Sequence, residues 1–150
     1  MALWQVDFFV LPKDAFEVLS LVSYPSTDED NCFDDAIFWL EEKISLSFFN
    51  SIANVLPITK SWHEDLTIFG SLESNCFEVL CKKNIAVSVS FRIDYTSEYE
   101  LILRGFIQFF ILNNLIVLTE DLIQIPLNFE VIKSTIENSQ RVQTYRMLSS

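Results

Sequence analysis

Residues 66–95 read LTIFGSLESNCFEVLCKKNIAVSVSFRIDY, and this stretch decides the fold. It holds three apolar runs, at 66–69, 76–81 and 85–95, separated by polar turns at 70–75 and 82–84. Short turns between successive strands predict an antiparallel meander. In the longest run the odd positions from 87 to 95 are apolar and the even positions from 88 to 94 are polar. This alternation predicts a sheet with one buried and one wet face.

The flanking sequence adds strands and helices around this meander. Trp4, Val6, Phe8 and Val10 alternate with their neighbours and predict a strand that Pro12 closes. We expect a loop over 23–31, a short helix over 34–40, and a helix capped by Ser45 that Pro57 ends. Later elements are a helix capped at Thr96 or Ser97 and reaching 112, strands at 116–118 and 123–125, a helix capped by Asn128, and a frayed helical tail over 140–150.

The predicted order is β-α-β-β-β-α-β-(β)-α in a single domain spanning residues 1–150. We expect an α+β two-layer sandwich, with helices on one face of a mainly antiparallel sheet. Half of the residues are hydrophobic and 14 are Phe, so the chain has enough apolar mass for a compact core. Both tryptophans outside the predicted helices, Trp4 and Trp62, are expected in the core or at its edge.

Charge and glycine content exclude several functions. The net charge of −11 argues against a surface for nucleic acid or anionic membrane, because both need clustered Lys and Arg. The chain has two glycines, Gly70 and Gly105, which is too few for a Gly-rich phosphate cradle or a dinucleotide fingerprint. We therefore expect no nucleotide cofactor, and no cofactor of another kind.

The cysteines and the apolar runs predict a cytoplasmic protein. Three cysteines (Cys32, Cys76 and Cys81) cannot all pair in one chain, and the first eleven residues lack the basic start of a secretory signal. We expect reduced, buried thiols. The run 101–118 is interrupted by Arg104 and three amides, so a buried helix followed by a strand explains it better than a membrane span.

The residue types and their spacing give little support for a catalytic or a metal-binding site. His63 is the sole histidine, and Cys76 and Cys81 are spaced to point to opposite faces of a strand, so neither catalysis nor a metal site is expected. Asp65 and Glu78 have the spacing of a nuclease core, but Leu80 occupies the place of its lysine. The polar row from Ser88 to Asp94 is either a binding face of the sheet or a solvated one with Arg92 and Asp94 paired locally.

The positive signal is an acidic segment with aromatic residues inside it. Seven of the fifteen positions from Asp28 to Glu42 are acidic, and no basic residue occurs between Asp28 and Lys43. Aromatic side chains surrounded by a rim of charged residues are typical of a protein-binding surface. The alternative is an amphipathic short helix that turns Phe33, Phe38, Trp39 and Leu40 toward the core while the acids keep it soluble, and the two can coexist. The candidate partner-binding residues are Asp28, Glu29, Asp30, Phe33, Asp34, Asp35, Phe38, Trp39, Glu41 and Glu42.

Several segments carry a resemblance to a known group of proteins. They are WQVDFF at 4–9, Ser61-Trp62, SNCFE at 74–78 and VSVSFRID at 87–94. With the small acidic α+β shape, they resemble the immunity proteins of bacterial polymorphic-toxin and contact-dependent growth-inhibition systems. The resemblance implies a non-catalytic partner of a toxin domain, with the cognate toxin a basic nuclease. Immunity proteins share no universal motif, so no family site residue is carried over.

Two other functions remain as hypotheses. An adaptor or regulatory subunit of a permanent complex predicts a large exposed apolar face. A hydrolase that uses carboxylates and a divalent cation predicts at least three acids converging in one pocket. Nothing in the sequence indicates a homo-oligomer.

Overall fold

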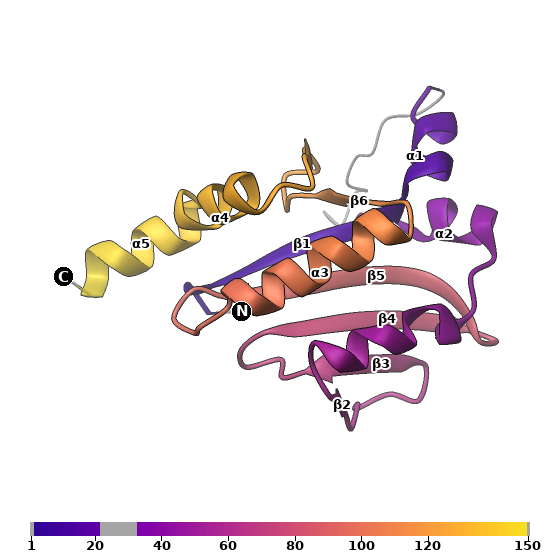
Figure 1. Ribbon diagram of the computed structural model, residues 1–150, viewed down its shortest axis with the longest axis horizontal. Helices are drawn as coiled ribbons and strands as arrows, with labels where there is room; N and C mark the ends of the chain where they lie inside the picture. Colours follow the sequence, from indigo (N-terminus) through magenta and orange to yellow (C-terminus); the bar gives the residue numbers. More distant parts are fainter. Residues whose placement is uncertain (1, 22–32, 150) are drawn as a thin grey trace.

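The computed structural model describes residues 2–21 and 33–149. Within these residues, seven strands form one antiparallel sheet in the order β2-β3-β4-β5-β1-β6-β7 (Figure 1). The strands are β1 (Gln5–Pro12), β2 (Ile58–Thr59), β3 (Leu66–Gly70), β4 (Cys76–Lys82), β5 (Ile85–Asp94), β6 (Leu115–Leu118) and β7 (Gln124–Ile125). The helices are α1 (Lys13–Leu19), α2 (Ala36–Glu42), the 3₁₀ helix η1 (Leu46–Asn54), α3 (Glu100–Leu112), α4 (Phe129–Glu137) and α5 (Gln140–Ser149).

The meander predicted from residues 66–95 is confirmed as strands β3, β4 and β5. The turn between β4 and β5 has positive φ at both Lys83 (52°) and Asn84 (64°), as a two-residue hairpin turn requires. The turn between β3 and β4 begins at Gly70 with φ of 87°. A Cβ on Gly70 would lie 2.3 Å from the Asn75 carbonyl oxygen, so this position needs glycine.

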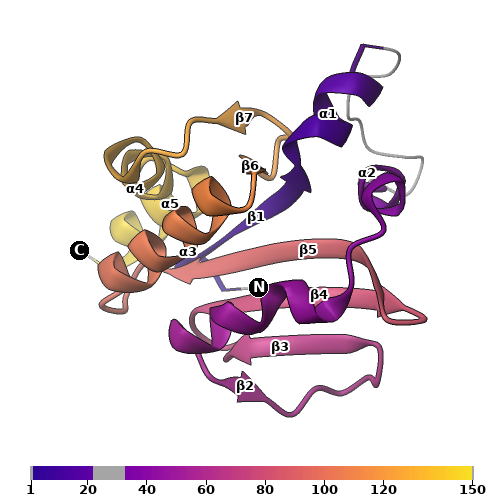
Figure 2. The ribbon, with the colours of Figure 1, turned by 45° about the vertical axis from the view of Figure 1, so that its right-hand side comes forward.

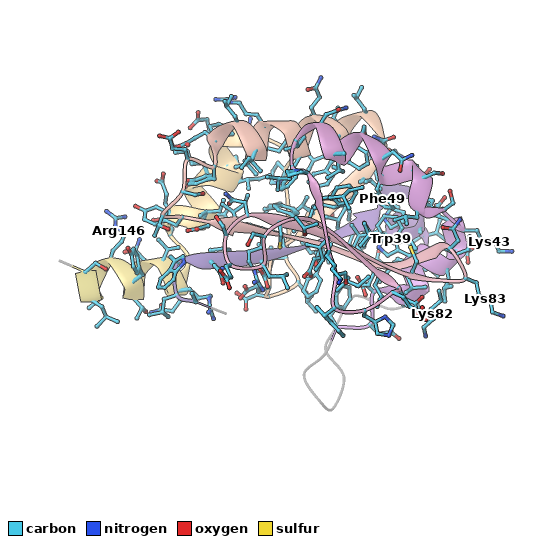
Figure 3. The ribbon with its side chains drawn as sticks, turned by 90° about the horizontal axis from the view of Figure 1, so that it is seen from below. Trp39, Lys43, Phe49, Lys82, Lys83 and Arg146 are labelled. Carbon is cyan, nitrogen blue, oxygen red and sulfur yellow. The ribbon has the colours of Figure 1, made fainter. Side chains whose placement is uncertain are left out.

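The helices η1 and α3 lie on the same side of the sheet and bury its apolar face (Figure 3). Phe8 of β1 stacks on Phe91 of β5 with ring centroids 4.9 Å apart. Phe106 of α3 lies 5.3 Å from both Phe91 and Phe77, and Phe49 of η1 lies 6.0 Å from Phe77. Helix α4 adds Ile132 and Ile136 to the same core. The α+β class and the two-layer arrangement predicted from the sequence are therefore confirmed.

The alternation along β5 holds, with one irregularity. The register of β4 and β5 shifts between Leu80 and Cys81, where Leu80 pairs with Ser88 and Cys81 with Ala86. The extra residue, Val87, is buried but lies outside the main core cluster, whereas Ala86 belongs to it. A bulge of this kind adds one residue to one strand, which the period-2 pattern alone does not reveal.

Some local predictions were wrong. Helix α1 and strand β2 were not predicted, and the segment from Leu46 is a 3₁₀ rather than an α-helix. Helix α3 is preceded by Tyr99, because Thr96 and Ser97 bond to Asp94 instead. Trp62 is 76% exposed and Trp4 is 36% exposed, so Trp62 is a surface residue and not part of the core.

Candidate functional site

Helix α2 is seated in a fork of the sheet. Strands β1 and β5 pair from Gln5 and Asp94 up to Phe9 and Ser90; β1 then continues along β6 and leaves β5. Helix α2 contacts both strands where they diverge (Figure 2). After the helix, the backbone of Ile44 accepts a hydrogen bond of 2.8 Å from the Ala86 N–H. The segment that contains α2 thus covers backbone groups of β1 and β5 that the two strands no longer pair with each other.

Two candidate binding residues satisfy polar groups in this fork. The Trp39 indole N–H donates to the Val10 carbonyl over 3.0 Å. The Asp35 carboxyl accepts from the Ser88 hydroxyl over 2.8 Å and from the backbone of Val89. An unpaired buried backbone group costs about as much as a lost hydrogen bond. Asp35 and Trp39 therefore fix α2 to the sheet.

Burial separates the candidate residues into two groups. Phe38 and Trp39 are 1% and 0% exposed, and Asp35 is 6% exposed. Phe33 is half-buried and its ring lies 4.9 Å from that of Phe9. These aromatic side chains belong to the core, as the amphipathic-helix interpretation predicts, but its placement of Leu40 in the core was wrong, because Leu40 is 51% exposed. Anchors for a partner therefore have to come from exposed side chains. Asp34, Glu41 and Glu42 are exposed, and Asp28, Glu29 and Asp30 lie outside the described residues.

The exposed side of α2 adjoins α1, and the sequence pattern does not indicate this arrangement. Helix α1 packs against α2, with the Phe16 and Phe38 rings 5.9 Å apart. Asp14 of α1 and Glu42 of α2 line one hollow of about 290 Å³. We call the exposed carboxylates of the two helices and of Asp34, which precedes α2, together with two exposed apolar residues of α2, the acidic α1–α2 surface. Its residues are Asp14, Glu17, Asp34, Ile37, Leu40, Glu41 and Glu42.

The apolar part of this surface is aliphatic rather than aromatic. Ile37 is 48% exposed and Leu40 is 51% exposed, and both lie on α2 among its carboxylates. Lys13 and Lys43 are exposed at its ends, and Lys43 lies near Lys82 and Lys83 at the tip of the β4–β5 hairpin (Figure 3). The spacing of Ala15, Phe16 and Leu19 indicates a helical face, and this was the signal that could have revealed α1.

Burial raises the pKa of the Asp35 carboxyl from 3.8 to about 6. The hydrogen bond from Ser88 opposes this shift, and the nearby charge of Asp34 adds to it. Desolvation disfavours the charged form of a buried acid. Asp35 is therefore a structural carboxyl that is partly protonated near pH 6.

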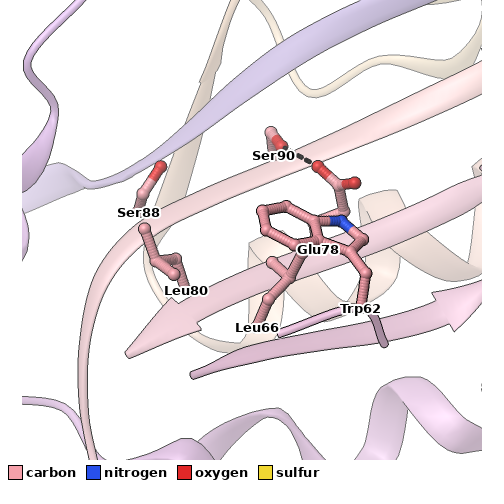
Figure 4. Close-up of a pocket in the computed structure, with 6 residues that line it drawn as sticks. All are labelled: Trp62, Leu66, Glu78, Leu80, Ser88 and Ser90. Atoms are coloured by element: carbon pink, nitrogen blue, oxygen red, sulfur yellow. Dashed lines mark hydrogen bonds between the residues drawn. The ribbon is translucent and has the colours of Figure 1, made fainter. Parts of the chain in front are cut away.

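A second feature lies on the sheet face opposite η1 and α3. A cavity of about 250 Å³ is lined by Trp62, Leu66, Glu78, Leu80, Ser88 and Ser90 (Figure 4). Glu78 and Ser90 are joined by a hydrogen bond of 3.3 Å. Burial raises the pKa of Glu78, and the charge of Arg92 opposes the shift. The polar row of β5 thus borders a cavity.

Arg92 pairs with Asp7 and not with Asp94. Its guanidinium makes two hydrogen bonds to the Asp7 carboxylate, of 2.8 and 3.2 Å, and a third to the Leu72 carbonyl. Asp94 instead accepts a hydrogen bond from Ser74. The predicted local pair between Arg92 and Asp94 was wrong, because neighbouring strand β1 brings Asp7 opposite Arg92.

The remaining candidates have ordinary environments. The Nδ1 atom of His63 accepts a hydrogen bond from the Asp65 N–H over 3.0 Å. Cys76 and Cys81 are buried free thiols, and burial raises the pKa of Cys76 to about 12. Across residues 2–21 and 33–149, no three His, Cys, Asp or Glu side chains gather in a group that could hold a metal ion. In the same part of the chain, no helix has the length and apolar character needed to cross a membrane.

Comparison of the chain with protein-family models gave no match, and comparisons with curated proteins and with solved structures gave none either.

Proposed function

We propose that this protein is a non-catalytic immunity protein that binds a cognate bacterial toxin domain, a basic nuclease, through the acidic α1–α2 surface. The observation that carries the proposal is the arrangement of α2. Its exposed side holds Ile37, Leu40 and the carboxylates of Glu41 and Glu42, and Asp34 is exposed just before it. Trp39 and Asp35 fix the helix to the sheet. A rigid, charged surface with apolar residues inside it has the features of a protein-binding site.

The physical basis is competition for a phosphate-binding groove. A nuclease surface is basic because it binds the phosphate backbone. Carboxylates displayed on a fixed helix match that charge and accelerate encounter with the toxin. Ile37 and Leu40 become buried on contact and slow dissociation. The net charge of −11 adds a favourable long-range field.

The test first requires a candidate toxin domain, which should be sought among the genes adjacent to the one for this protein. Co-expression of both proteins in a bacterial host should restore growth, and association rates should be measured at low and high salt. Replacing the three exposed acids in and just before α2, by Asp34→Asn, Glu41→Gln and Glu42→Gln, should slow association by about tenfold at low salt and by much less at high salt.

A matched control removes three exposed acids elsewhere, by Glu64→Gln, Glu98→Gln and Glu130→Gln. This control variant removes the same number of negative charges as the α2 variant and should slow association far less. Equal effects of the two triple variants would refute the acidic α1–α2 surface as the binding site. A toxin that this protein neither binds nor neutralises would refute the proposed function.

One observation favours the adaptor hypothesis as a second candidate. Helix α3 has three exposed apolar side chains: Leu101 is 82% exposed, Ile111 60% and Leu112 74%. Exposed apolar side chains on one helix are typical of a surface that a permanent partner covers. An adaptor should co-purify from its own cells in a stoichiometric complex, and substituting Ile111 and Leu112 by Ser should release that partner.

A further inference from the structure

The cavity on the sheet face combines three kinds of side chain. Leu66 and Leu80 provide apolar walls, Ser88 and Ser90 provide hydroxyls, and Glu78 provides a carboxylate (Figure 4). The sixth residue, Trp62, belongs to the loop before β3 and lies at the cavity with 76% of its surface exposed. The indole is therefore accessible to a ligand.

Glu78 keeps acceptor capacity for a ligand. Its hydrogen-bond donor is the Ser90 hydroxyl, at 3.3 Å, whereas a carboxylate accepts about four hydrogen bonds. The guanidinium of Arg92 is held by Asp7 and the Leu72 carbonyl. Arg92 forms its ion pair with Asp7, and among the described residues no Lys or Arg forms an ion pair with Glu78. The raised pKa of Glu78 reflects its burial and is consistent with a carboxylate that a cation would stabilise.

The combination matches a planar organic cation. An indole face attracts a cation, and a guanidinium also stacks on it in a parallel arrangement. The carboxylate and hydroxyls accept hydrogen bonds from the guanidinium N–H groups. The two leucines suit the aliphatic stem that carries such a group. A volume of about 250 Å³ is below the roughly 300–1,000 Å³ typical of pockets for drug-sized ligands, so the ligand has the size of one side chain.

We propose that this cavity binds the guanidinium group of an arginine side chain or of a small arginine derivative. The proposal does not depend on the proposed toxin partner, because the recognising groups lie on the sheet and in the loop before β3, and not on α1 or α2. The site is nevertheless next to α2, since Ser88 lines the cavity and also bonds to Asp35. A basic partner that docks on the acidic α1–α2 surface could place an arginine here.

The experiment is an NMR titration of the ¹⁵N-labelled protein that follows the indole N–H signals of Trp62 and the backbone signals of Glu78 and Ser90. The probe is N-acetyl-arginine methylamide, and the neutral control is the citrulline analogue of the same shape. We expect saturable shifts at these residues with a dissociation constant on the order of 1 mM. The citrulline analogue and n-butylamine should bind at least about fivefold more weakly.

Two variants assign the recognition to the cavity. Glu78→Gln and Trp62→Phe should each weaken binding by about tenfold or more, while Glu64→Gln, which changes the same charge two residues from Trp62, should have little effect. The unliganded spectra report whether each variant is folded. Equal binding of the citrulline analogue, or unchanged binding by both cavity variants, would overturn the proposal.

Free L-arginine and agmatine distinguish the source of the guanidinium. Similar affinities for agmatine and the blocked arginine would support a site for a side chain displayed by a protein. Binding of free L-arginine at least about tenfold tighter than the blocked form would support a site for the free amino acid. Absence of binding by all three guanidinium probes would overturn the proposal.

Discussion

The Ser88 hydroxyl donates a 2.8 Å hydrogen bond to the carboxyl of Asp35, a residue 53 positions earlier in the chain. This bond joins the start of α2 to β5 where β1 has separated from β5 and continues along β6. It also links the acidic α1–α2 surface to the cavity on the sheet. Asp35 directly precedes α2, and Ser88 lines the cavity together with Trp62. The protonation of Asp35 therefore affects how firmly α2 is held.

Asp35→Asn should remove a pH-dependent loss of stability. The pKa of Asp35 is raised from 3.8 to about 6, so the folded state binds more protons than the unfolded state between these values. The wild-type free energy of unfolding should therefore fall as pH rises from 4 to 7, and the shift corresponds to on the order of 3 kcal/mol. Asn keeps an acceptor oxygen for Ser88 and stays neutral, so the variant should lack this decline.

Urea denaturation of both proteins at several pH values measures the difference. Glu41→Gln, a change at an exposed acid of α2, is the control and should follow the wild-type profile. A difference between wild type and Asp35→Asn that stays constant from pH 4 to 7 would contradict the assignment of a raised pKa.

Trp39→Phe should destabilise the protein because it removes the donor to the Val10 carbonyl. The carbonyl would be left unpaired in a fully buried position, and the smaller ring would leave a cavity. Together these should lower the free energy of unfolding by at least about 2 kcal/mol. Trp62→Phe is the matched control, and it should change stability by less than about 0.5 kcal/mol because Trp62 is 76% exposed. Similar losses in both variants would argue against the role of Trp39 in the fork.

The sheet was predictable because its signals are local. The alternation in residues 66–95 fixed three strands, and Asn128 was correctly predicted as a helix cap, since its side chain accepts from the Val131 N–H. Ser45 occupies a cap position, but its hydroxyl bonds to Ser47. The same amino-acid type in the same place can thus have different partners, and sequence alone does not choose between them.

The candidate site was harder to predict, because burial in the acidic segment depends on a tertiary feature. Nothing in the sequence indicates that β1 and β5 diverge after Phe9 and Ser90. The fork explains why Trp39 is buried while Ile37 and Leu40, in the same short helix, are exposed. It also explains why Asp35 is buried next to an exposed Asp34.

Gly70→Ala should be strongly destabilising, whereas Gly105→Ala should be nearly neutral. At Gly70 the φ of 87° disfavours any L side chain, and the added Cβ meets the Asn75 carbonyl oxygen at 2.3 Å. The loss should exceed about 2 kcal/mol. At Gly105 the Cβ meets a Val55 methyl at 2.8 Å, but Ala favours the helix by about 1 kcal/mol over Gly, which offsets the crowding. Thermal and urea unfolding of both variants test this contrast, and equal losses would contradict it.

Replacing Ile37 and Leu40 together by Ser should accelerate dissociation of the toxin domain without changing its association. Both side chains are about half-exposed on α2, so the free protein should lose little stability. In the complex they would lose contact area at the centre of the acidic α1–α2 surface, and the dissociation rate should rise by at least about tenfold. The association rate depends on the carboxylates, which are unchanged, so it should stay within about twofold.

The control for this last variant is Ile111→Ser with Leu112→Ser on α3, which removes exposed apolar surface from another helix. It should leave both rates at their wild-type values if the toxin binds at α1 and α2. A faster dissociation caused by the α3 variant, with no effect of the α2 variant, would move the binding surface to α3. That outcome would favour the apolar face of an adaptor over the charged surface of an immunity protein, because α3 presents Leu101, Ile111 and Leu112 rather than a carboxylate cluster.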